Sequence, residues 1–284
     1  MNGDAEAYTI ARRTLVEATI ALQSLAPEAF VLVGAHAVYL RAPENDLGVP
    51  AFTLDGDLAV NPTLLTGSRA VRVRLGEAGF DLRERHSGLY ERRGVHVDVQ
   101  RASRVDIFVP AAFEYAWSSE GYDARAVMVQ PGLEACLVDR SPMELVTLDD
   151  GRPRLSASIH VAGIVALLVA KGWKIGERYE QGPEAFAEVR KDLGDIYRLL
   201  RASDPDETAA TLRVLRDDRH VREAVRTGAR YLRELCAGRG AGLREFSTLL
   251  GSSAGQRTAT ASLAALTEEF TETVESVFAA HTLM

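Results

Sequence analysis

The sequence predicts an α+β protein in which an N-terminal α/β part with a small mixed sheet precedes a C-terminal helical bundle. Two observations support this fold class. Up to about residue 158, short apolar or alternating runs bounded by glycine and proline alternate with helical patterns. Beyond it, apolar residues recur at helical spacing over long segments. We therefore expect two domains, residues 1–158 and 159–284, a division between layered and bundled secondary structure.

The first half contains three helical patterns and a larger number of short strand patterns. Helices are predicted over residues 5–25, 35–41 and 66–78. Strands are predicted over residues 30–33, 52–60, 88–92, 95–100 and 104–109, with further strands and loops between 124 and 158. Gly94 and residues 101–103 separate the last three of these named strands, which favours hairpins.

The second half reads as helices separated by short breaks. The helical segments are residues 160–173, 184–201, 206–216, 220–235 and 258–281. Asp204-Pro205-Asp206 and the glycine-rich stretch 238–242 interrupt them. This pattern predicts a bundle that carries its own apolar core.

Composition excludes several classes of protein. The chain has 284 residues, of which 46% are hydrophobic and 26% charged, as is typical of globular proteins. Cys136 and Cys236 are too far apart to form a metal cluster or a disulfide framework. No apolar run is long enough to cross a membrane, and no signal peptide is recognised, so we expect a cytoplasmic protein with no membrane contact.

The residues that most clearly indicate a function lie on the strand that follows Gly34. Thr53, Asp55 and Asp57 alternate along the next strand, so they share one face of it. Two neighbouring carboxylates repel each other unless a cation lies between them, and Mg²⁺ accepts such ligands together with phosphate oxygens. Gly34 also opens a turn into a helix, whose first N–H groups can bind a triphosphate near Ala35 and His36. His36 could instead pack in the core.

A third strand acid would complete such a metal site. Asp106 is the first choice because it interrupts an otherwise apolar strand, RVDIFVP. Asp98 in VHVDVQ is the alternative, since its strand alternates and could face water. A third carboxylate would either bind the metal or accept a proton.

The first helix of the second half ends in cations. Lys171, Lys174 and Arg178 follow one another along one helical face. Asp195 lies within the apolar stripe of the next helix, where an unpaired carboxylate would be costly, so we expect it to pair with Lys171. Asp192, one turn earlier, could equally lie on the helix surface.

These motifs resemble those of the AbiEii/MenT nucleotidyltransferase toxins. VLVGAHAVYLR and FTLDGDLAV are similar to the first motif of the nucleotidyltransferase fold, in which a glycine turn opens a helix and D-x-D follows on the next strand. LLVAKGWKIGER and RKDLGDIYRLL resemble the lysine and K-D-x-x-D motifs. The sequence departs from the family pattern at Ala35, where the family has Ser or Gly, and at Gly56, where it has an apolar residue.

The resemblance implies a nucleotidyltransferase that moves an NMP group from an NTP to an acceptor hydroxyl and releases pyrophosphate. It maps the catalytic carboxylate onto Asp55 with Thr53 as its hydroxyl neighbour, the essential lysine onto Lys171 and the late aspartate onto Asp195. Asp55, Asp57 and Asp106 would hold Mg²⁺ or Mn²⁺, and Lys174 would add to the nucleotide site. It further implies that the acceptor is the 3′ end of tRNA and that a cognate antitoxin protein exists.

Two other classes of function remain open at this point. A nucleotidyltransferase of this type could modify a small molecule, as aminoglycoside adenylyltransferases do, or a protein hydroxyl. A binding module could also have kept the fold and lost the chemistry, although the joint presence of Asp55, Asp57, Lys171 and Asp195 speaks against it.

The net charge of −7 argues against general nucleic-acid binding, yet arginines concentrate near the C-terminal part of the chain. One set is spaced so that it would form a single row on a helix: Arg219, Arg222, Arg226, Arg230 and Arg233. If unpaired, these side chains would repel one another and could bind an RNA backbone. A solvated surface, or contact with an acidic antitoxin, explains the same row.

Overall fold

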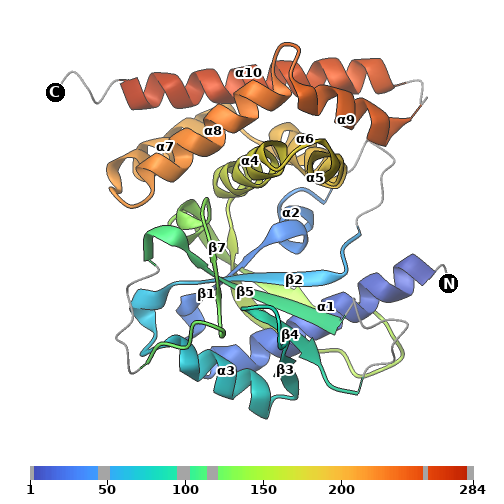
Figure 1. Cartoon of the computed structure of the whole chain (residues 1–284), viewed down its shortest axis with the longest axis vertical. Coiled ribbons are helices and arrows are strands. Elements are labelled where there is room, and N and C mark those ends of the chain that lie inside the picture. The colour runs from blue at the N-terminus through green and yellow to red at the C-terminus, as the bar shows by residue number, and fades with distance from the viewer. Residues whose placement is uncertain (1–2, 44–51, 95–102, 114–120, 252–254, 280–284) are drawn as a thin grey trace. The chain divides into compact units, whose positions relative to one another are not determined.

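The computed structural model describes residues 3–43, 52–94, 103–113, 121–251 and 255–279 (Figure 1). The chain forms two compact units. The first contains residues 1–37, 51–130 and 140–162, and the second contains residues 38–50, 131–139 and 163–284. The main division therefore comes after Ala162, not after residue 158, because the last strand of the first unit continues to Ala162.

The first unit is built on a mixed sheet, as expected for an α+β chain, and eight strands of it lie in the described residues. Their order is β3-β4-β5-β2-β1-β8-β7, with β6 paired to β5. The strands are β1 (Phe30–Val33), β2 (Asp55–Val60), β3 (Phe80–Leu82), β4 (Leu89–Arg92), β5 (Arg104–Pro110), β6 (Met128–Gln130), β7 (Arg140–Val146) and β8 (Ser156–Ala162). Within this sheet β2 runs parallel to β5 and antiparallel to β1.

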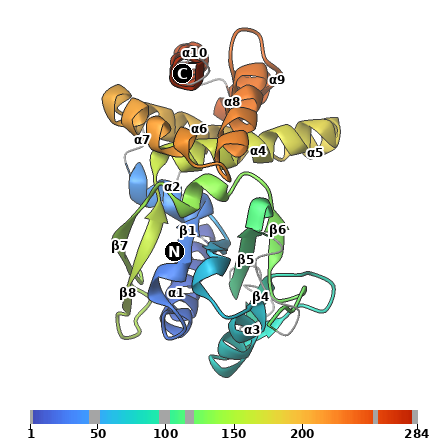
Figure 2. The ribbon, with the colours of Figure 1, turned by 90° about the vertical axis from the view of Figure 1, so that its left-hand side faces the viewer.

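One face of the sheet is covered by α1 (Gly3–Gln23), with α3 (Ser68–Glu77) beside it (Figures 1 and 2). The alternation of β2 and β5 explains this packing. Leu58 of β2 and Val105 and Ile107 of β5 are fully buried, while the residues between them point to the opposite face. Consequently the acidic residues of these strands lie on the face that α1 does not cover.

Helix α2 (Gly34–Arg41) follows β1 directly, without a connecting loop. The four residues of β1 are all buried, which is typical of a central strand with neighbours on both sides. The end of β1 therefore fixes the position at which α2 begins.

The second unit is helical. It contains α4 (Ile164–Glu180), α5 (Pro183–Ala187), α6 (Arg190–Ala202), α7 (Pro205–Asp217), α8 (Arg222–Cys236), α9 (Ala241–Leu250) and α10 (Gln256–Ala279). Helix α4 packs against α8 and α6, and α10 packs across α7, α8 and α9 (Figure 2). Among the described residues, none of the helices is long and apolar enough to cross a membrane.

Four elements differ from the sequence prediction. Residues 160–162 are strand, and the helix predicted from 160 begins at Ile164 and continues to Glu180. The single helix predicted over 184–201 is divided into α5 and α6 by a turn at residues 188–189. Strand β3 and helix α9 were not predicted, and the strand predicted over 95–100 lies outside the described residues.

Candidate metal centre and its surroundings

Three carboxylates converge at the first half of β2 and β5. Asp57 lies directly opposite Asp106 in the parallel ladder, and Asp55 lies two residues earlier on the same face of β2. Each offers one carboxylate oxygen, and these oxygens all lie within 4.8 Å of one another. Asp106 thus lies beside Asp55 and Asp57, while the alternative, Asp98, falls outside the described residues.

The orientation of Asp55 is fixed by a residue that precedes the strand. Thr53 is buried, and its hydroxyl donates a hydrogen bond of 2.7 Å to Asp55 Oδ1. This is the hydroxyl neighbour that the sequence indicates, although the strand begins at Asp55 and not at residue 52. One lone-pair direction of Asp55 is therefore used within the chain, which restricts the side chain to a single orientation.

Gly56, between the two acids of β2, makes room for α1. A Cβ atom at this position would lie 2.8 Å from Leu15 Cδ1, closer than packed carbon atoms approach. The departure from an apolar residue here is therefore explained by packing, because Leu15 fills the space that a side chain would occupy.

Gly34 is required where β1 passes into α2. Its φ of +64° lies in the left-handed region, and a Cβ atom there would overlap the carboxylate of Asp57. The start of α2 therefore lies against the acidic cluster. The first N–H groups of a helix and its dipole favour an anion at this place.

The two residues after Gly34 are largely enclosed. Ala35 and His36 are both buried, and the His36 ring stacks on Tyr8 with ring centres 5.3 Å apart. His36 thus takes the packing role that the sequence left open, so only its backbone remains suited to bind phosphate.

Mutual repulsion of the three carboxylates favours a cation at the acidic cluster. At an effective dielectric constant of about 20, two unit charges 4.8 Å apart repel by roughly 3 kcal/mol. Arg104 is opposite Asp55 in the ladder, but its Nε donates to Glu91 at 2.9 Å. Carboxylate oxygens suit Mg²⁺ or Mn²⁺, whose ligand oxygens stand up to about 4.2 Å apart. Asp55, Asp57 and Asp106 could therefore hold a divalent ion after a small inward movement.

No family model, curated protein or solved structure matches this chain. The function must accordingly be argued from the geometry and chemistry of its own residues.

A second charged cluster lies within the helical unit. Lys171 of α4 is buried, and its Nζ donates to Asp192 Oδ1 at 2.5 Å and to Asp195 Oδ2 at 2.7 Å, both on α6. The expected pairing of Lys171 with Asp195 is present. Asp192 is not a surface acid: it is 5% exposed and also accepts from the exposed Lys174 at 3.2 Å.

The ion pair between Lys171 and Asp192 holds both of these groups in their charged forms. Burial alone would lower the pKa of Lys171, but the negative charges of Asp192 and Asp195 outweigh it and keep that pKa above its ordinary value. Burial would likewise raise the pKa of Asp192, but Lys171 and Lys174 hold it below its usual range. Lys171 and Asp192 therefore stay ionised at neutral pH.

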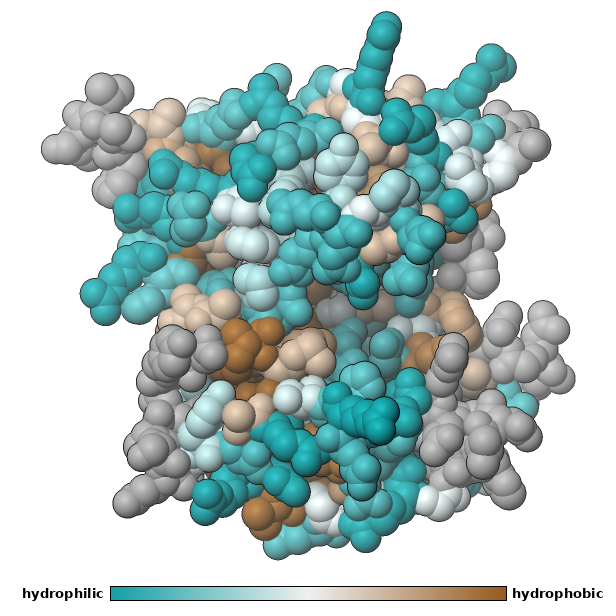
Figure 3. Space-filling view, viewed as in Figure 1, coloured by the Kyte–Doolittle hydropathy of each residue, from teal (hydrophilic) through white to brown (hydrophobic). Residues whose placement is uncertain are grey.

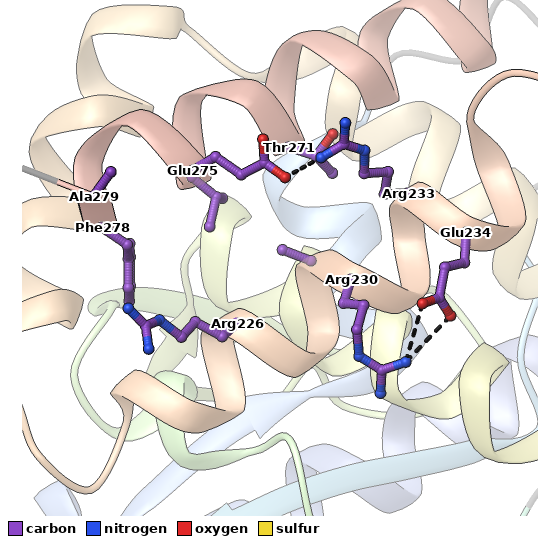
Figure 4. Close-up of a pocket in the computed structure, with 10 residues that line it drawn as sticks. Arg226, Arg230, Arg233, Glu234, Thr271, Glu275, Phe278 and Ala279 are labelled. Carbon is purple, nitrogen blue, oxygen red and sulfur yellow. Dashed lines mark hydrogen bonds and ion pairs between the residues drawn. The ribbon is translucent and has the colours of Figure 1, made fainter.

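The arginine row is not a set of unpaired cations. Arg230 pairs with Glu234 at 3.2 Å, and Arg233 pairs with Glu275 of α10 (Figure 4). Glu234 faces Arg230 because residues four apart on a helix lie on the same side of it, so the row is not the unpaired set considered from the sequence.

The other members of the row also have neighbours. Arg222 Nε donates to the carbonyl of Arg216 at 2.8 Å, and Arg219 precedes α8 and donates to His220. The Arg226 guanidinium lies 5.6 Å from the centre of the Phe278 ring.

A hollow of about 450 Å³ lies between α8 and α10 beside three of these arginines, Arg226, Arg230 and Arg233. In the view of Figure 3, which has the orientation of Figure 1, the surface over α8 and α10 is mainly hydrophilic. Arg226 faces an aromatic ring and, among the described residues, forms no ion pair with an acid, whereas Arg230 lies over the Tyr231 ring and also pairs with Glu234.

Cys136 and Cys236 are free and buried, and burial raises the pKa of Cys236 to about 12, so neither thiol is suited to act as a nucleophile. Sequence reasoning passed over Arg12, which is buried in α1. The signal was present in the sequence, since the Arg12-Arg13 pair interrupts an otherwise apolar helical face.

Proposed function

We propose that this protein is a metal-dependent nucleotidyltransferase, which transfers an NMP group from an NTP to an acceptor hydroxyl and releases pyrophosphate. The observation that carries the proposal is the joint position of the acidic cluster and Gly34. Three carboxylates suited to a divalent ion lie together, and one of them, Asp57, lies against the start of a helix whose N–H groups suit phosphate.

The chain's own residues define what the site does. Asp55, held by Thr53, and Asp57 would bind the divalent ion. Asp106 would complete the ligand set or accept the proton of the attacking hydroxyl. When bound, Mg²⁺ or Mn²⁺ would supply charge for the phosphate oxygens. The close approach of Gly34 to Asp57 would bring phosphate and metal ligands together.

The resemblance to AbiEii/MenT toxins gives the proposal its finer detail. It assigns Lys171 to the neutralisation of phosphate charge and Asp195 to the orientation of Lys171. The hydrogen bond of 2.7 Å between them supports the second role. The same resemblance supports a nucleotidyltransferase fold, the 3′ end of tRNA as acceptor, and a cognate antitoxin as partner.

The experiment that tests the proposal is a transfer assay. Pure protein is incubated with each of the four labelled NTPs, Mg²⁺ and total RNA, and the label is followed into acid-insoluble material. We expect transfer from at least one NTP, because the metal and phosphate sites need no further cofactor. An assay with RNA replaced by aminoglycosides or by protein extract separates the alternative acceptors.

Asp55→Ala is the decisive variant, and Asp81→Asn is its matched control. Asp81 is an exposed strand acid paired with Arg93 at 3.3 Å. Asp55→Ala should lower transfer by roughly 10³-fold or more while the protein stays folded, since oriented charge at a reacting centre contributes that much. Asp81→Asn should transfer at the wild-type rate. Wild-type rates in Asp55→Ala, or no transfer from any NTP to any acceptor, would refute the proposal.

A further inference from the structure

Arg104 lies on the same face of the sheet as the acidic cluster. In the parallel ladder Arg104 of β5 is opposite Asp55, and it comes two residues before Asp106, so these three side chains leave the sheet on one side. Among the described residues, Arg104 forms no ion pair with the acids of the cluster, and its Nε donates instead to Glu91 of β4 at 2.9 Å. The strands thus place a guanidinium beside the candidate metal centre without using it to neutralise that centre.

Glu91 holds Arg104 in this position and leaves most of its donors unused. Glu91 Oε1 also accepts from Arg83 at 3.1 Å, so two guanidinium groups share one carboxylate and leave a net positive charge. The side chain of Arg104 is 24% exposed, and among the described residues only its Nε has a hydrogen-bond partner. The two terminal nitrogens of Arg104 therefore remain to donate to an anion from outside the chain.

The acidic cluster separates Arg104 from the start of α2. Strand β2 lies between β1 and β5. Val33, the last residue of β1, is opposite Asp57, and Gly34 follows it. The helix start that suits a triphosphate is therefore on the β1 side of the acids, whereas Arg104 is on the β5 side, two strand spacings or about 10 Å away. An anion bound at Arg104 is accordingly a different group from the triphosphate.

We propose that Arg104 binds a phosphate of the acceptor, next to the hydroxyl that receives the NMP group. This inference rests on the proposed function and names the class of its acceptor, the end of a nucleic-acid strand. Asp106, the residue suited to take the proton of that hydroxyl, lies about 6.6 Å along β5 from Arg104, so one strand end can meet both. Beyond Arg104, Arg83 and Glu91 line a hollow of about 370 Å³, which leaves room for more of the strand.

The test measures how the full-length protein binds a short single-stranded RNA with a free 3′ hydroxyl, by fluorescence anisotropy. Two probes of one sequence differ only in their last linkage, which is a phosphodiester or an uncharged methylphosphonate. The wild type should bind the phosphodiester probe at least tenfold more tightly, as expected for a charged hydrogen bond. Arg104→Gln should bind both probes with the weaker affinity. Its salt dependence should fall by about 0.7 unit of slope, the value for one phosphate contact with a single strand.

Arg92→Gln is the matched control. The side chain of Arg92 in β4 is 33% exposed and its Nε donates to Glu17 of α1 at 2.8 Å, so it lies on the opposite face of the sheet. Arg92→Gln should distinguish the two probes as the wild type does. Arg104→Lys provides a second variant at the site itself. It should keep the salt dependence and lose part of the affinity, because an ammonium group is charged but lacks the planar fork of a guanidinium.

Calorimetry of NTP binding with Mg²⁺ and without RNA separates this inference from the proposed function. Arg104→Gln should bind NTP within about twofold of the wild type. If the wild type binds NTP but does not distinguish the probes, or if Arg104→Gln distinguishes them equally well, Arg104 binds no acceptor phosphate and the proposed function stands. Equal losses in Arg104→Gln and Arg92→Gln, or a loss of NTP affinity in Arg104→Gln, would also overturn the assignment. If the wild type binds no NTP, both proposals fail.

Discussion

The sheet unit and the helical unit each enclose a group of carboxylates, but only the helical unit supplies a lysine to them. Asp192 and Asp195 of α6 share the ammonium group of Lys171, at 2.5 and 2.7 Å. Asp55, Asp57 and Asp106 of the sheet converge on one another within 4.8 Å. The first group is paired with a lysine of the chain, whereas the second group offers three carboxylate oxygens at a spacing that a divalent ion could use.

This difference separates a structural arrangement from a binding arrangement. Removal of one partner from a charge pair buried within the fold costs stability, and the intact pair resists change in its protonation. A set of like charges held together by strands is tolerated because neighbouring elements define its position, and it lowers stability until a ligand binds. The comparison predicts opposite responses of the two clusters to substitution.

The largest effect is expected for Lys171→Ala. Loss of the lysine leaves the buried Asp195 without its cation and Asp192 with only the exposed Lys174, and breaking a buried pair costs about 3–5 kcal/mol of unfolding free energy. If the proposed function holds, transfer should also fall by roughly 10²-fold. Urea denaturation checks the stability. A variant with wild-type stability and near-normal transfer would show that Lys171 is needed neither for folding nor for the reaction. The role proposed for Lys171 would then pass to Lys174.

A smaller effect is expected for Asp192→Asn, because Asp195 continues to pair with Lys171. We expect a loss of about 2 kcal/mol at neutral pH, since hydrogen bonds to charged groups contribute on that order. The pKa of Asp192 is lowered in the folded state, so its contribution is present above about pH 4 and lost as the pH falls through the folded-state value. The stability difference between wild type and variant should therefore shrink from pH 6 to pH 3. A difference that does not change with pH would contradict the ion pair.

Asp57→Asn should change stability in the opposite direction. With divalent ions removed by EDTA, loss of one of three converging charges should raise the unfolding free energy by about 1 kcal/mol, the cluster being partly solvated. Added Mg²⁺ should raise the melting temperature of the wild type more than that of the variant. Destabilisation without metal would show that Asp57 is needed for packing against Gly34.

The sequence predicted those parts of the two clusters that depend on neighbouring residues, and it missed those that depend on contacts between distant segments. Asp55 and Asp57 share a face because of strand periodicity, which is a local property. Asp106 was identified because an acid interrupts an apolar strand, and the parallel register of β2 and β5 supports that choice. The burial of Asp192 could not be predicted, since it depends on Lys171, which comes from another helix.

The same contrast between local periodicity and contacts from distant parts of the chain explains which elements of the fold were predicted. The mixed sheet and the helical second half follow from periodicity, but residues 160–162 form a strand because they pair with β1 and β7, a non-local influence. Helix α9 was missed because Gly238, Gly240 and Gly242 dominate its start, and tertiary packing of Phe246 overrides that local tendency. Metal binding by the acids of β2 and β5 is a prediction that both the sequence and the structure support.

The smallest effect is expected in the arginine row. Arg226→Glu should weaken RNA binding a few-fold and lower its salt dependence by about one unit of slope, as for a lost phosphate contact. The matched control is Arg230→Glu, whose arginine is already paired with Glu234. Gel-shift titrations at several salt concentrations measure both. If neither variant changes RNA affinity, the row is a solvated surface or contacts another partner.

Binding of Mn²⁺ to the metal-free protein tests the central claim most directly, because it needs neither NTP nor acceptor. Electron paramagnetic resonance measures the unbound ion during titration of the wild type, Asp106→Asn and the control Asp81→Asn. We predict saturable binding by the wild type and by Asp81→Asn, and at least tenfold weaker binding by Asp106→Asn, whose change removes one of three carboxylate ligands. Equal Mn²⁺ affinity in all three proteins, or no binding by the wild type, would contradict the assignment of Asp55, Asp57 and Asp106 as a metal centre.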